Sequence, residues 1–140
     1  MVRNTMIKLA KMTDYAVIVL ADMAGHAALM SASEIAERTE LPEPTVSKIL
    51  KALAKHKIVA STRGSSGGYA LNMKPEEISM ADVVSATDGP IALTACVDEG
   101  SSCCDRSHSC SMKGQWNPVN LAMQNALENV SLQQMMGSGQ

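Results

Sequence analysis

The apolar residues of this 140-residue chain change from helical to strand-like spacing near residue 57, and this change restricts its fold more than any other feature. Before it, a helix is expected over residues 43–56, because four apolar residues recur at i, i+3, i+4 and i+7: Val46, Ile49, Leu50 and Leu53. After it, residues 58–63 and 69–73 each suit a short strand, and the glycine-rich segment between them suits a hairpin tip. The pattern predicts a helix followed by a β-hairpin.

Two further helices are expected before this one. Residues 13–25 are apolar round much of a helix, and the glycine at their end can stop it. Ser31 and Glu34 have the spacing of a capping box that opens a short second helix. A turn through residues 41–42 then leads into the third helix. Three helices followed by a hairpin form a winged helix-turn-helix, which we predict over residues 8–75 as a DNA-binding domain.

The rest of the chain predicts more helix. Ser79 begins a capped helix inside a connecting region, residues 76–95. A cysteine-rich loop is expected over residues 96–113, a long final helix over 114–136 and a flexible tail over 137–140. The predicted fold class is mainly α with a small β-hairpin: a winged helix-turn-helix DNA-binding domain plus a long C-terminal dimerisation helix.

Basic side chains gather in the third helix and the hairpin, although the formal net charge is −2. Seven carboxylates lie between residues 76 and 105, so basic and acidic side chains are concentrated in different parts of the chain. A basic stripe can also be an ordinary solvated helix face, and a winged helix can serve as a protein-interaction module. Salt-dependent DNA affinity separates these alternatives from a DNA-binding surface.

In a helix-turn-helix the second helix enters the major groove, and its first residues meet the base edges. Hydroxyl and carboxylate groups can bond to bases there, whereas lysines mostly hold phosphates. A glycine-rich hairpin tip lets the backbone approach the sugar-phosphate chain. The candidate DNA-binding residues are therefore Glu43, Pro44, Thr45, Ser47, Lys48, Lys51, Lys55, Arg63, Gly64 and Gly67.

All four cysteines of the chain lie within one short segment, together with a histidine: Cys96, Cys103, Cys104, Cys110 and His108. Thiolates are soft ligands that suit iron-sulfur clusters, zinc or cuprous copper. Closely paired cysteines of the zinc-knuckle type are missing, which disfavours structural zinc. A disulfide sensor is a further alternative, because Cys96 or Cys110 could resolve an oxidised partner thiol. The segment predicts a metal or thiol-redox site, with an iron-sulfur cluster favoured.

The sequence also predicts the compartment of the protein and whether it is an enzyme. It has no apolar stretch of the roughly twenty residues that cross a bilayer, and its start lacks the apolar part of a signal peptide. We therefore expect a cytoplasmic protein with no membrane partner, in a compartment where thiols stay reduced. Because the sequence contains no catalytic triad, phosphate loop or nucleotide fingerprint, we expect no enzyme activity.

Residues 6–16, 41–50, 63–69 and 89–94, together with the cysteine segment, carry a resemblance to a known family. On these residues the chain resembles the IscR and NsrR family of bacterial repressors over nearly its whole length. It looks most similar to the regulators of the SUF operon, which encodes iron-sulfur cluster assembly. The resemblance implies a homodimer whose long C-terminal helix crosses the partner subunit, and a cluster, 2Fe–2S or 4Fe–4S, whose presence changes operator affinity.

The resemblance also implies which residues hold the cluster. Cys104 and Cys110 match the spacing of the second and third ligand cysteines of IscR-like members, and Cys96 stands at the first. Lys113 replaces the histidine that completes the shell in those members, and a protonated lysine cannot ligate. In NsrR-like members an aspartate of the first helix reaches over from the other subunit, and Asp14 matches it. The implied ligands are Cys96, Cys104, Cys110 and Asp14, with Cys103 and His108 as alternatives.

Together, these features predict a dimeric transcriptional repressor that binds a palindromic operator in double-stranded DNA. It is expected to sense iron-sulfur cluster status and to regulate SUF-type cluster assembly genes. A regulator that senses nitric oxide, peroxide or thiol redox state is the first alternative. A small redox protein that does not bind DNA is more remote, because the basic helix and hairpin would then have no role.

Overall fold

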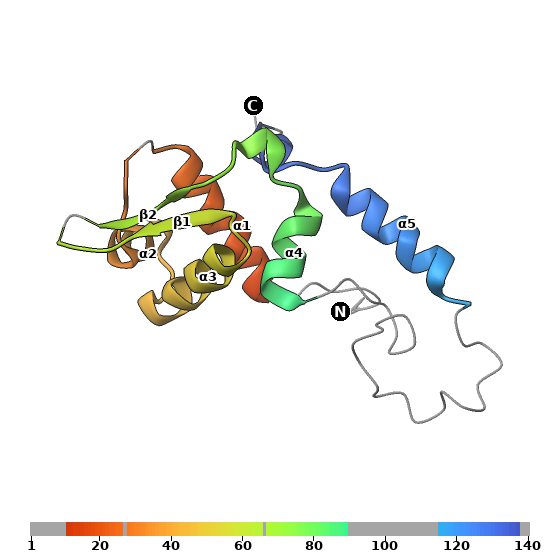
Figure 1. Ribbon diagram of the computed structural model, residues 1–140, viewed down its shortest axis with the longest axis horizontal. Helices are drawn as coiled ribbons and strands as arrows, with labels where there is room; N and C mark the ends of the chain where they lie inside the picture. Colours follow the sequence, from red (N-terminus) through yellow and green to blue (C-terminus); the bar gives the residue numbers. More distant parts are fainter. Residues whose placement is uncertain (1–10, 27, 66, 90–114, 138–140) are drawn as a thin grey trace, which may run out of the picture.

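The computed structural model describes residues 11–26, 28–65, 67–89 and 115–137. Three helices come first, α1 (Lys11–Ala24), α2 (Ala32–Thr39) and α3 (Glu43–Lys55), and an antiparallel hairpin of β1 (Val59–Thr62) and β2 (Gly68–Leu71) follows them (Figure 1). The described chain continues with a 3-10 helix η1 (Pro75–Glu77) and three α-helices, α4 (Met80–Asp88), α5 (Asn117–Glu128) and α6 (Leu132–Gly137). This order confirms the predicted mainly helical winged-helix fold.

The helix starts predicted from serine capping patterns are confirmed. Ser31 accepts a hydrogen bond from the backbone N–H of Glu34 (3.1 Å) and so caps α2. Ser79 accepts from the N–H of Asp82, and the Asp82 carboxylate accepts from the N–H of Ser79, both at 3.1 Å. Each cap satisfies N–H groups that the first helical turn leaves unpaired, which fixes the residue at which each helix begins.

One core lies between the helices of the winged-helix domain. The four residues predicted to form the buried face of α3 are fully buried. The inner face of α1 and the first turn of α4 pack against them, so the core joins the winged-helix domain to the helix that follows it. Its fully buried members include Ala16, Val19, Leu20, Val46, Ile49, Leu50, Leu53 and Val83.

Helix α4 lies between the winged-helix domain and α5 (Figure 1). It packs against α1 and α3 on one side and against α5 on the other. Residues 90–114, which contain the predicted cysteine loop, follow α4 in the chain and lie outside the described residues. Among the helices that the structure describes, none is long and apolar enough to cross a bilayer.

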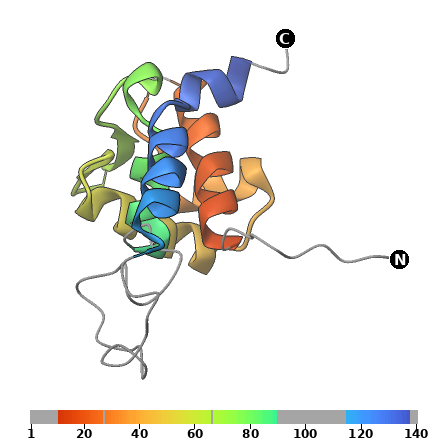
Figure 2. The ribbon, with the colours of Figure 1, turned by 90° about the vertical axis from the view of Figure 1, so that its right-hand side faces the viewer.

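The final part of the chain differs from the single long helix predicted over residues 114–136. Helix α5 ends at Glu128, and α6 begins at Leu132 and runs in another direction (Figure 2). The backbone N–H of Ser131 donates to Gln134 Oε1 (2.8 Å), and the N–H of Gln134 donates to Ser131 Oγ (3.1 Å). This reciprocal cap starts a new helix, so the chain turns at residues 129–131.

The turn is fixed by pairing with the start of α4. The N–H of Met80 donates to the carbonyl of Val130, and the N–H of Leu132 donates to the carbonyl of Ile78, both at 2.8 Å. Ser79 and Ser131 thus form a short antiparallel bridge. Because Ile78 and Leu132 are both fully buried, this bridge lies against the core.

Candidate DNA-binding surface

Helices α2 and α3 are joined by a tight turn. Glu40 has a left-handed backbone conformation (φ 58°) at the end of α2, and the N–H of Leu41 donates to the carbonyl of Ala36 (3.2 Å). Pro42 precedes α3 in an extended conformation, and Pro44 lies in its first turn, where a missing N–H costs nothing. The turn therefore ends one helix and starts the next within a few residues.

A side-chain contact also joins the two helices. Ser33 Oγ in α2 donates to Glu43 Oε2 at the start of α3, over 2.8 Å. Both residues are exposed. Glu43, predicted to contact bases, is thus already directed toward α2 by Ser33.

The predicted basic stripe is present on α3. Lys48, Lys51 and Lys55 are exposed, on the side of the helix opposite its four buried apolar residues. Thr45 and Ser47 are half-buried on the same helix. Glu43 and Pro44 are exposed in the first turn, where a recognition helix meets base edges.

The hairpin tip carries the other predicted DNA contacts. Arg63 and Gly64 are both exposed, and Gly64 has a φ of 114°, which favours glycine. A Cβ on Gly67 would lie 2.0 Å from the carbonyl oxygen of Thr62, so only glycine fits there. The glycine at position 67 is thus required by the hairpin itself, whatever its part in DNA binding.

The hairpin is attached to the chain that precedes α2. Met30 and Tyr69 exchange two backbone hydrogen bonds, of 3.0 and 2.7 Å, and form an antiparallel bridge beside β2. A Cβ on Gly68 would lie 2.6 Å from the carbonyl oxygen of Met30. Glycine at this position therefore allows the close approach that holds the hairpin against the domain.

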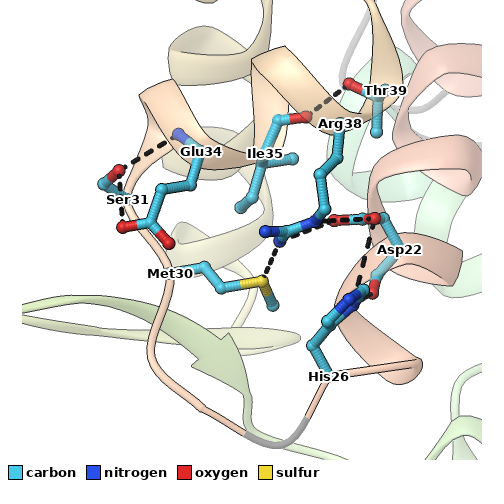
Figure 3. A network of polar contacts seen from close by, with 8 residues as sticks. All are labelled: Asp22, His26, Met30, Ser31, Glu34, Ile35, Arg38 and Thr39. Carbon is cyan, nitrogen blue, oxygen red and sulfur yellow. Dashed lines mark hydrogen bonds and ion pairs between the residues drawn. The ribbon is translucent and has the colours of Figure 1, made fainter.

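An ion pair joins α2 to α1 (Figure 3). The Arg38 guanidinium donates to both carboxylate oxygens of Asp22 at 3.0–3.1 Å and also contacts Met30 Sδ. Hydrogen bonding to the Asp22 carboxylate raises the pKa of Arg38 above its ordinary value. His26 Nδ1 donates to the backbone carbonyl of Asp22 (2.8 Å). Arg38 therefore holds α2 against α1, and its charge is used inside the protein. The lysines of α3 are exposed instead.

The predicted cluster ligands fall in two parts of the chain. Asp14 is exposed in the first turn of α1. Cys96, Cys103, Cys104, Cys110 and His108 lie outside the described residues. Within the described ranges, no group of three or more histidines, cysteines, aspartates and glutamates could hold a metal ion.

Sequence reasoning missed the residues that position the surface. Ser33 and Gly68 have no special pattern around them, since their partners lie 10 and 38 residues away in the chain. Arg38 and Asp22 are separated by 16 residues, so helical spacing does not relate them. The capping pattern of Ser131 and Gln134 was visible in the sequence and could have shown the break before α6.

Comparison with known proteins agrees with this architecture. Residues 9–138 match the Rrf2 family, described as iron-dependent transcriptional regulators. The transcriptional regulator IscR of Aliivibrio salmonicida is 31% identical over 131 residues, which cover 92% of this chain and 77% of that protein. NsrR of Bacillus subtilis is 29% identical over 131 residues, covering 92% and 90%. The structure of T. potens IscR superposes with a TM-score of 0.69 at 25% identity, covering 96% of this chain and 90% of that one.

These relatives are named as transcriptional regulators, which confirms the prediction that this protein is not an enzyme. Their class implies DNA binding, in agreement with the basic helix and hairpin described above. The family match covers nearly all of the chain, including the helices of the winged-helix domain, its hairpin, α5 and α6. The chain belongs to the Rrf2 family of transcriptional regulators.

Proposed function

We propose that this chain is a DNA-binding repressor that senses iron-sulfur cluster status and regulates SUF-type cluster assembly genes. The observation that carries DNA binding is the row of exposed lysines on α3, opposite a fully buried apolar face. In this proposal the first turn of α3 reads bases, while Lys51, Lys55 and Arg63 hold phosphates. Gly64 and Gly67 let the hairpin tip approach the backbone of the DNA.

The cofactor proposal depends on the chemistry of the donor set. Four thiols in one segment after α4, and an exposed carboxylate at Asp14, are groups that can ligate iron. We propose Cys96, Cys104, Cys110 and Asp14 as ligands, with Cys103 and His108 as alternatives. When bound, a cluster would make the regulator responsive to the supply of iron and sulfide. Repression when clusters are plentiful would then give feedback on their assembly.

A homodimer is part of the proposal. Three large apolar side chains of the α5 region are strongly exposed: Trp116 (44%), Val119 (46%) and Leu121 (56%). Helix α5 lies at the edge of the described molecule and packs against α4 (Figure 1). Val119 and Leu121 lie on the two flanks of α5, on either side of the buried Asn120. A second copy of the chain that packs along this helix could cover them and place two recognition helices on the half-sites of a palindromic operator.

The decisive experiment combines spectroscopy with DNA binding. Protein purified without oxygen should show visible charge-transfer bands with matching iron and sulfide content, and the bands should be lost in Cys104→Ala. Ser101→Ala, in the same segment, is the matched control and should keep them. Loaded and cluster-free protein should then differ in affinity for DNA from the control region of cluster assembly genes. Colourless protein after anaerobic reconstitution, or equal affinities, would contradict the proposal.

A thiol-redox regulator is the second candidate, favoured by the presence of four cysteines where three suffice for the proposed ligand set. It would keep the DNA-binding surface and use Cys96 or Cys110 to resolve an oxidised thiol. Peroxide treatment of cluster-free protein distinguishes it. A disulfide that forms reversibly and changes DNA affinity, in protein that binds no iron, would favour this candidate.

A further inference from the structure

The hydroxyls of Thr13 and Thr87 form a hydrogen bond of 2.7 Å between two helices that are 74 residues apart in the chain. Thr13 is buried, with 2% of its surface exposed, and lies in the first turn of α1. Thr87 lies in the last turn of α4. Within the described part of the chain, Thr13 and Asn120 are the two buried polar residues. The contact therefore stands out in an otherwise apolar packing surface.

The direction of the bond follows from the second contact of Thr87. Thr87 Oγ1 donates to the backbone carbonyl of Val83, 2.9 Å away, and a carbonyl can only accept. A hydroxyl has one proton, so Thr87 must accept from Thr13. The result is a short chain of hydrogen bonds that runs from α1 to the backbone of α4 and leaves both hydroxyls satisfied.

The position of this contact gives it more than a packing role. Thr87 lies two residues before Gly89, where α4 ends and the chain continues toward the cysteines. Thr13 directly precedes Asp14, and α1 packs against α3 as well as α4. Val83, in the middle of α4, is fully buried in the same core as the inner face of α3. One hydrogen bond thus holds the end of α4 to a helix that contacts the recognition helix.

We propose that the Thr13–Thr87 hydrogen bond is a positioning contact that transmits the state of the cysteine segment to the recognition helix α3. This inference rests on the proposed function and adds to it two residues that act through helix packing, without touching DNA. Coupling between sites requires an element that both sites bias, and α4 is the described element that leads to the cysteines and contacts α3. Without the bond, the last turn of α4 can move without moving α1.

The test compares hydroxyl removal with hydroxyl retention. Thr13→Val removes the donor but leaves Thr87 bonded to Val83, so no buried donor is orphaned. Thr13→Ser keeps the hydroxyl and should rescue the wild-type behaviour. The double variant Thr13→Val/Thr87→Val replaces both partners with apolar groups of the same shape, which is tolerated better than leaving one unpaired. If Thr13→Val folds poorly, the double variant is measured in its place.

Thr39→Val is the matched control. Thr39 Oγ1 donates to the carbonyl of Ile35 (2.7 Å), which is the same kind of part-buried threonine contact within a single helix, α2 (Figure 3). Its loss should lower stability slightly but should not alter communication between the cysteine segment and α3. The control therefore separates a general effect of removing a threonine hydroxyl from the loss of a link between α1 and α4.

Each variant is measured as full-length protein, with and without reconstituted cluster, on a DNA duplex that the wild-type protein selects from a random pool. The ratio of loaded to cluster-free affinity should move toward one by about fivefold in Thr13→Val, and should be unchanged in Thr13→Ser and Thr39→Val. Amide hydrogen exchange of α4 should respond to loading in the wild type and lose this response in Thr13→Val. If the bond has a merely structural role, its loss should lower both affinities equally and leave their ratio intact. That result would overturn the inference and leave the proposed function standing. Wild-type protein with no cluster, or with equal affinities, would overturn the proposed function and the inference together.

Discussion

Ser33 donates a hydrogen bond to Glu43 across the turn of the helix-turn-helix, with 2.8 Å between Ser33 Oγ and Glu43 Oε2. The contact restrains a carboxylate at the first position of α3. A negative charge there stabilises the helix N-terminus but repels DNA phosphates. The orientation of this side chain is therefore set inside the protein before DNA is met. A residue in α2 thereby influences what the first turn of α3 can contact.

We expect Ser33→Ala to weaken DNA binding about fivefold, because a net contribution of about 1 kcal/mol is typical of such a hydrogen bond. The released carboxylate should also change the base preference beneath the first turn of α3. Selection from a random DNA pool, followed by affinity measurement, checks both effects. Ser85→Ala, on α4, should bind like the wild type. Identical affinity and preference in Ser33→Ala would show that the contact does not position Glu43 for DNA.

Lys51→Ala and Lys55→Ala should each weaken binding to all DNA sequences to a similar extent. A lysine that holds one phosphate releases about one counterion, so the slope of log affinity against log salt should fall by about one for each variant. Titrations at several salt concentrations, on specific and random duplexes, measure this slope. Lys74→Ala removes an exposed lysine near η1 and should leave the slope unchanged. An unchanged slope in the α3 variants would show that Lys51 and Lys55 do not contact phosphates.

Gly68→Ala should destabilise the protein by about 1–3 kcal/mol. The new Cβ would lie 2.6 Å from the carbonyl oxygen of Met30, so the bridge to Tyr69 must open or shift. Urea unfolding measures the change in the free energy of unfolding. Gly25→Ala is the control, because its Cβ would make an ordinary contact at 3.6 Å. Equal stability of the two variants would mean that the hairpin does not need its attachment to the domain.

Arg38→Gln should lower the free energy of unfolding by an amount that stays constant between about pH 6 and about pH 9. The pKa of Arg38 is raised by its hydrogen bond to Asp22. A raised pKa of a cation contributes stability that is present below the unfolded-state pKa and is lost only as the pH rises through the folded-state value. For arginine this window lies far above neutrality. Urea midpoints of the variant and the wild type across this range should therefore run parallel.

A carboxylate on the exposed surface of α5 should weaken self-association. Val119→Asp and Leu121→Asp each place a charge where a second copy of the chain would bury an apolar side chain. Sedimentation equilibrium should show a lower dimer fraction, with far-UV circular dichroism unchanged. Gln133→Glu, which adds the same charge at an exposed position on α6, is the control. Wild-type protein that stays monomeric at high concentration would contradict the proposed homodimer.

The elements that could be predicted from the sequence are those fixed by contacts within a few residues. The caps at Ser31 and Ser79 and the buried face of α3 follow from local spacing, and the structure confirms them. The Arg38–Asp22 pair and the Thr13–Thr87 bond depend on how helices pack, which local spacing does not determine. The break before α6 was predictable in part, from the serine-glutamine cap, but its pairing with the start of α4 was not.

The bridge between Ser79 and Ser131 joins the start of α4 to the start of α6. The stretch of chain between these two residues contains α4, α5 and residues 90–114, and its two ends are joined by the bridge. When the ends of a flexible loop are held together, each doubling of its length costs only about 0.6 kcal/mol. Segments of other lengths and ligand chemistries could therefore be exchanged at this point without rebuilding the part that reads DNA.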